Sequence, residues 1–148
     1  MMRALIAGTT FVFVALVFLV STATAAAPEA TTIAATVTQF GPAPDFQGIW
    51  QASGGVNDAG AFVETELHDT SSFVNSPVVV AFQAVLVFRG ARGTITIAQQ
   101  AHYAGGFPQG TWEIRSGTGI YEGLTGHGTF AFSPPNSLTF RGSTSRAG

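Results

Sequence analysis

The sequence predicts a small all-β protein, and three observations lead to this fold class. Without residues 1–25, ten Phe and seventeen Gly remain beside only four Leu, a composition typical of strands and turns rather than of helices. Clusters of Gly, Pro, Asn and Asp interrupt the chain about every ten to twelve residues, the spacing expected of β-sandwiches and barrels. No stretch shows helical periodicity for longer than one turn.

Seven or eight strands account for this pattern, depending on whether Thr31–Phe40 adds a first strand, and consecutive hairpins place each strand beside the next. We expect the strands at Thr31–Phe40, Phe46–Ser53, Ala61–Leu67, Val78–Phe88, Thr94–Tyr103, Thr111–Ser116, Thr129–Phe132 and Leu138–Gly142. An antiparallel meander of eight strands closes into a barrel, because closure removes the exposed edges of the sheet. The interior of such a barrel is filled by side chains or holds one small ligand.

Length and composition exclude several classes of protein. The 148 residues suit one domain, and the lack of cysteine excludes a disulfide framework, thiolate metal sites and cysteine nucleophiles. The six basic residues are all arginines, they form no cluster, and the net charge is -2. We therefore expect no nucleic-acid partner, since binding to phosphates requires clustered basic residues.

The first 25 residues have the three parts of an export signal. Arg3 gives a positive start, an apolar run follows over Ala4–Val20, and Ala23-Thr24-Ala25 has the small-x-small form of a cleavage site. The alternative is a retained membrane anchor, which needs roughly 20 apolar residues and usually charged flanks. Because the run is shorter, we expect cleavage of a signal peptide at 1–25 and a secreted protein that leaves the membrane.

The mature chain divides into an N-terminal arm at 26–44 and one β-barrel domain at 45–148. The arm is rich in Ala, Thr and Pro, and we expect it to be flexible apart from the first strand. Gly41-Pro42-Ala43-Pro44 separates the two parts, because proline lacks the N–H that a strand needs.

Alternation within the strands predicts which side chains face inward. Phe46–Ser53 places Trp50 and its alternate neighbours on one face. In Ala61–Leu67 we expect Val63 and Leu67 inward. Glu64 and Glu66 are then expected to point to water.

The strand Val78–Phe88 is apolar on both faces apart from Gln83. A membrane-spanning barrel would need such lipid-facing rows in every strand, and the polar outer faces elsewhere favour a soluble barrel. Either the N-terminal arm or a second subunit therefore covers the outer face of this strand, and we favour a homo-oligomer contact through it.

The most distinctive segment is the glycine-rich run Gly117–Gly128, GTGIYEGLTGHG. A phosphate-binding loop needs a helix after its glycines, whereas the residues that follow are strand-like and include no lysine. The run resembles the signature G-[ST]-G-I-[FY]-E-G-x-x-G of allene oxide cyclases, with matches from Gly117 to Gly123 and at Gly126. It is also similar, more weakly, to the G-T-G-x-[FY] element of plant dirigent proteins.

This resemblance implies an eight-stranded calycin-like barrel, often a trimer, with an apolar cavity and no cofactor. Allene oxide cyclases close a fatty-acid epoxide and dirigent proteins steer radical coupling, in both cases by holding a reactive apolar molecule in one shape. The resemblance carries over no catalytic residue to this chain.

Histidines and carboxylates provide no clear reactive group. His68, His102 and His127 lie in different segments, and no metal-binding spacing joins them, so we expect no metal site. Glu113 and Glu122 could form an acid–base pair, but Glu113 alternates with apolar neighbours and is expected to face water.

The leading hypothesis is an exported barrel that binds or conformationally guides a small apolar molecule. The alternatives are a cofactor-independent cyclase or isomerase of the allene oxide cyclase type and a structural or assembly protein of the cell surface. The candidate ligand-binding residues, in the barrel interior or at its mouth, are Trp50, Phe82, Trp112, Tyr121, Glu122 and His127. For the two tryptophans, a place in the core is the competing interpretation.

Overall fold

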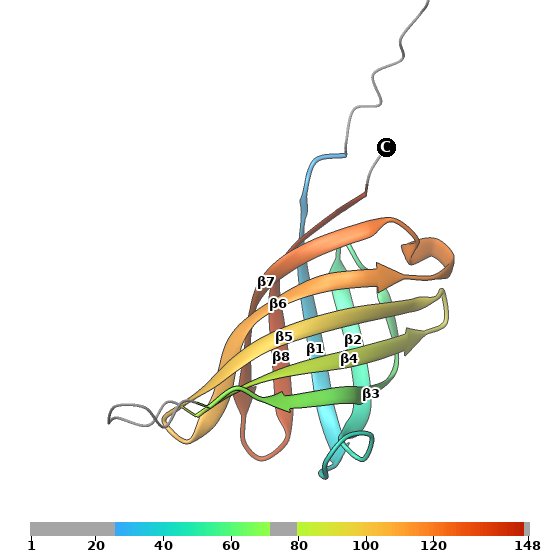
Figure 1. Cartoon of the computed structure of the whole chain (residues 1–148). Helices are drawn as coiled ribbons and strands as arrows, with labels where there is room; N and C mark the ends of the chain where they lie inside the picture. Colours follow the sequence, from blue (N-terminus) through green and yellow to red (C-terminus); the bar gives the residue numbers. More distant parts are fainter. Residues whose placement is uncertain (1–25, 72–79, 147–148) are drawn as a thin grey trace, which may run out of the picture.

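The computed structural model describes residues 26–71 and 80–146, which form one closed antiparallel β-barrel (Figure 1). Eight strands pair in chain order, and β1 closes the cylinder by pairing with β8. The predicted eight-stranded barrel is thereby confirmed. The strands are β1 (Glu29–Gln39), β2 (Gln47–Gly54), β3 (Asp58–Asp69), β4 (Ala81–Gly90), β5 (Thr94–Ala104), β6 (Phe107–Gly117), β7 (Leu124–Ser133) and β8 (Ser137–Arg146).

The N-terminal part of the described chain is a full strand. β1 begins at Glu29, two residues before the predicted start, and pairs over most of its length with both β2 and β8. The predicted signal peptide at 1–25 lies outside the described residues. Within the ranges 26–71 and 80–146, no helix has the length and apolar character needed to cross a membrane.

The predicted alternation holds in β2, where Gly48, Trp50 and Ala52 are buried between exposed residues. In β3, by contrast, the prediction for two positions is wrong. Glu64 is buried, and Val63 is only half-buried on the other face.

Phe62 explains this reversal. Its ring stacks on Phe88 with 5.5 Å between the ring centroids, and the side chain is 2% exposed. Because side chains alternate along a strand, an inward Phe62 places Glu64 in the barrel as well. An irregularity between Glu64 and Glu66 then shifts the register, so Glu66 stays exposed as predicted, while Leu67 reaches the rim of the barrel.

The strand β4 is apolar on both faces within its described part. Leu86 and Phe88 are fully buried inside the barrel, and outward-facing Val85 is also buried within the single chain. Gln83 is exposed, as the sequence indicates, and the predicted residues 78 and 79 lie outside the described residues. A second subunit over this face stays a prediction.

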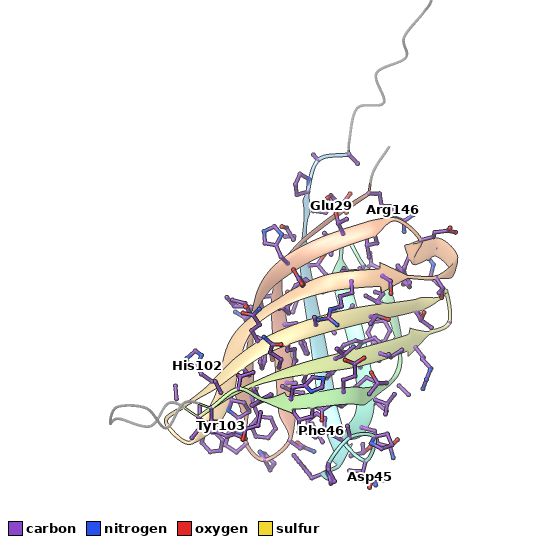
Figure 2. The ribbon with its side chains drawn as sticks, in the orientation of Figure 1. Glu29, Asp45, Phe46, His102, Tyr103 and Arg146 are labelled. Carbon is purple, nitrogen blue, oxygen red and sulfur yellow. The ribbon has the colours of Figure 1, made fainter. Side chains whose placement is uncertain are left out.

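The two ends of the barrel are built differently. Glu29 and Arg146 lie at one end, whereas Phe46 and Tyr103 lie at the other (Figure 2). At the first, which we call the closed end, a short 3-10 turn, η1 (Gly119–Tyr121), brings Tyr121 inward to 1% exposure. The second end, which we call the mouth, opens into a pocket.

Glycines in the run Gly117–Gly128 make the closed end compact. Gly119 has a φ of +61°, which favours glycine. At Gly117 an added Cβ would overlap the carbonyl oxygen of Tyr121. The glycines therefore let the chain fold Tyr121 back over the end of the barrel.

Candidate ligand-binding site

A pocket of about 630 Å³ occupies the mouth of the barrel. This volume lies within the range of small-molecule sites, roughly 300–1,000 Å³. Most of its wall is apolar, and the largest group in it is a set of seven aromatic side chains from four strands and from the connection between β1 and β2. These are Phe40, Phe46, Phe82, Tyr103, Phe107, Phe130 and Phe132, which we call the aromatic wall.

Four rings of the aromatic wall form one connected group, and Phe82 and Tyr103 form a separate pair. Phe40 lies edge-on to Phe46 and to Phe132, with centroid distances of 5.9 and 6.2 Å. Phe107 stacks on Phe132 at 6.1 Å. Such contacts hold rings in defined orientations, so the wall presents a shaped surface to a ligand.

Exposed apolar surface is concentrated around this pocket. In the described part of the chain, six large apolar side chains are exposed, and all but Ile49 line the pocket. The five are Phe40, Leu67, Val80, Tyr103 and Phe107. Concentrated apolar exposure on a small protein is typical of a binding surface.

Glu64 is the buried acidic group of the pocket. It extends from β3 into the barrel and is 6% exposed. No ion pair to its carboxyl group occurs among residues 26–71 and 80–146. Burial raises the pKa of Glu64 to about 7, because the charged form loses its hydration without gaining a partner.

Gln99 is the second buried polar group. It lies on β5 between Ala84 and Trp112 of the neighbouring strands and is 4% exposed. Its Nε2 atom is buried and has no hydrogen-bond partner within the part of the chain that the structure describes. An unpaired buried donor costs about 1–3 kcal/mol, so a ligand that satisfies this amide would gain that energy.

The charges along the pocket have one sign. Glu64 and Asp69 are its ionisable acids, and its described lining includes no Arg, Lys or His. Hydrogen bonds from the side chain and backbone N–H of Ser71 lower the pKa of Asp69, which is therefore ionised at neutral pH. The site combines aromatic surface with negative charge.

The six predicted ligand-binding residues do not come together in this pocket. Phe82 lines it. Trp50 and Trp112 are buried in the core, where each indole N–H donates to backbone carbonyls of neighbouring strands. Glu122 is exposed in the turn after η1, and His127 is exposed on β7, opposite Glu113 in the strand register.

Tyr121, the sixth predicted residue, closes the far end of the barrel. Its hydroxyl donates to Oδ2 of Asp58 over 2.9 Å, and burial together with this carboxylate raises the tyrosine pKa to about 12. Asp58 also accepts backbone N–H groups of Ala59, Ala91 and Arg92 at 2.9 to 3.1 Å. The glycine-rich run thus positions a structural contact.

The three histidines lie on different strands, β3, β5 and β7. His68 lies 3.7 Å from Glu66 on the exposed side of β3, and His102 lies 3.5 Å from Gln109. In the described ranges, no three His, Asp or Glu side chains are grouped as metal ligands would be.

Sequence reasoning missed Glu64 and Gln99, although the sequence contains a signal for each of them. Ile95 and Ile97 alternate with threonines in β5, and continuing that alternation places Gln99 inward. For Glu64, the signal was the large Phe62 two residues earlier.

Comparisons of the chain with protein-family models, with curated proteins and with solved structures give no match.

Proposed function

We propose that the protein binds a small, mostly apolar molecule in the pocket at the mouth of the barrel. The observation that carries this proposal is a pocket of about 630 Å³ with an aromatic wall. Among the described residues, the buried carboxyl group of Glu64 has no ion pair there, and the buried Nε2 of Gln99 has no hydrogen-bond partner. An apolar body would cover the exposed rings, and a polar end would reach Glu64 and Gln99. Filling the site would therefore remove two unfavourable features of the free protein.

Two finer aspects of the proposal depend on the sequence. The composition of residues 1–25 supports export of the protein. The run from Gly117 to Gly126 supports a barrel of the allene oxide cyclase and dirigent type, whose members hold apolar molecules. The proposal therefore includes export of the protein and a barrel of this type.

Binding of a neutral fluorescent probe tests this function. N-phenyl-1-naphthylamine is apolar and becomes more fluorescent when it leaves water, so titration with the mature protein should give a saturable increase. Val80→Trp adds bulk at the pocket lining and should weaken binding about tenfold, which corresponds to about 1.4 kcal/mol.

Ile49→Trp is the matched control, because Ile49 is 58% exposed on the outer face of β2. It should leave the affinity unchanged. Absence of saturable binding, or equal effects of the two substitutions, would contradict the proposal.

A second candidate is a cyclase or isomerase, and the position of Glu64 favours it. A carboxyl group with a pKa of about 7 inside an apolar pocket is suited to proton transfer. Turnover of an apolar epoxide by the protein, lost in Glu64→Gln while probe binding persists, would support this activity. Equal turnover by both proteins would exclude Glu64 as the proton-transferring group.

A further inference from the structure

We propose that the ligand is an organic cation, an ammonium group attached to an apolar body, and that the ammonium binds between Glu64 and the aromatic wall. This inference rests on the proposed function and specifies the chemical class of its ligand. It depends on two features of the mouth: its negative charge, including the buried Glu64, and its aromatic surface.

The charge of the mouth favours cations. The lining carries Glu64 and Asp69, with no basic side chain among its described residues. Arg89, Arg92 and Arg146 belong to strand ends and turns at the closed end. A positive ligand is therefore attracted to the mouth, and an anion is repelled from it.

The aromatic wall gives the cation a second favourable surface. The face of an aromatic ring carries negative electrostatic potential, so ammonium groups bind to it, most strongly where water is excluded. Seven rings line this pocket, and Phe46 and Phe130 extend it toward the core rings Phe62 and Phe140. An aliphatic lining of the same volume would favour apolar ligands without regard to charge.

The buried carboxyl group of Glu64 completes the argument. An ammonium group beside Glu64 would supply the partner that the buried carboxylate lacks among the described residues, whereas a ligand carboxylate would add a like charge there. The unpaired Nε2 of Gln99 is a donor and needs an acceptor, so it does not contribute to the preference for an ammonium group.

A series of ligands with one body and three polar ends tests this inference. We choose 4-phenylbutylamine, 4-phenylbutanol and 4-phenylbutyrate, and measure each dissociation constant by calorimetry at pH 8 and low salt. The amine should bind about tenfold more tightly than the alcohol, and the carboxylate about tenfold more weakly. In Glu64→Gln the difference between amine and alcohol should fall to about twofold or less, while alcohol binding persists.

Controls separate this inference from the proposed function. Glu113→Gln removes an exposed carboxylate on β6, outside the pocket, and should leave the order of affinities unchanged. Equal binding of all three ligands, or tighter binding of the carboxylate, would overturn the cation preference while upholding an apolar site. If none of the three ligands and no neutral probe bind, the proposed function itself fails. Thermal unfolding of each variant would verify that it is folded.

Discussion

The two ends of this barrel differ in how their polar side chains are hydrogen-bonded. At the closed end, the carboxylate of Asp58 accepts four hydrogen bonds, including one from the buried Tyr121. At the mouth, Glu64 and Gln99 are buried without partners of this kind: in the described part of the chain no ion pair reaches Glu64, and the Nε2 of Gln99 has no hydrogen-bond partner. The mouth thus retains polar groups that a ligand could satisfy.

The two ends also respond to pH in opposite directions. At Asp58, burial raises the pKa, but the hydrogen bonds from Ala59, Arg92, Tyr121 and Ala91 outweigh this effect and lower it. At Glu64, burial acts alone and raises the pKa to about 7. The folded protein is therefore more stable when Asp58 is ionised than when it is protonated. For Glu64 the order is reversed, and the protonated form is the more stable one.

The largest expected effect is the loss of Tyr121. Tyr121→Ala removes a ring that is 1% exposed and opens the closed end, so we expect about 3–5 kcal/mol less free energy of unfolding in urea denaturation. Tyr103→Ala at the mouth, where the ring is 49% exposed, should cost less than about 1 kcal/mol. Equal losses at the two positions would remove the distinction between the ends.

Asp58→Ala should have the next largest effect, about 2–3 kcal/mol at pH 7, since four donors at the closed end lose their acceptor. The pKa of Asp58 is lowered from 3.8, so its contribution is present above that pH and is lost as the pH falls through the lower folded value. Urea denaturation at pH 7 and pH 2.5 should therefore show the two proteins converging in acid. A difference that stays constant with pH would mean that the ionised carboxylate is not the stabilising form.

Glu64→Gln should reveal the opposite slope at the mouth. Between the unfolded pKa of 4.5 and the folded value of about 7, the folded protein binds the proton more tightly, so stability falls as the pH rises through this window. We expect the stability of the variant relative to wild type to increase by about 2 kcal/mol from pH 4 to pH 8. This is less than the full shift implies, because the open mouth lets water screen the charge. A difference that is independent of pH would contradict the raised pKa.

The sequence predicted the barrel well because closure depends on features that repeat in every strand. Turn residues mark most strand ends, and alternation in β2 identifies the inward face from Gly48, Trp50 and Ala52. These signals are local, and each strand contributes its own. An error in one strand, such as the orientation of β3, therefore left the predicted architecture unchanged.

The candidate site was harder to predict because it depends on which end of the barrel a residue occupies. Tyr121 and Phe82 are both inward aromatic residues, yet one seals the closed end and the other lines the pocket. Glu64 was assigned to water because the alternation was counted from Val63 as an inward residue, whereas Phe62 is the buried residue that fixes the inward face of the strand. The most informative residues of the site are those that contradict the average behaviour of their type.

Gln99→Met gives the smallest expected effect and the most specific one. Methionine has a similar shape without the amide, so the unpaired Nε2 disappears and the protein should gain about 1 kcal/mol in urea denaturation. Gln100→Met is the control, because Gln100 is exposed and points to the other face of β5; it should change stability by less than about 0.5 kcal/mol. If Gln99→Met is instead less stable than wild type, the amide already has a hydrogen-bond partner, such as a bound water. The polar groups at the mouth would then be paired, as Asp58 is at the closed end. A gain in stability together with weaker binding of 4-phenylbutanol, whose hydroxyl oxygen can accept from Nε2, would show that the amide is retained for the ligand at a cost to the fold.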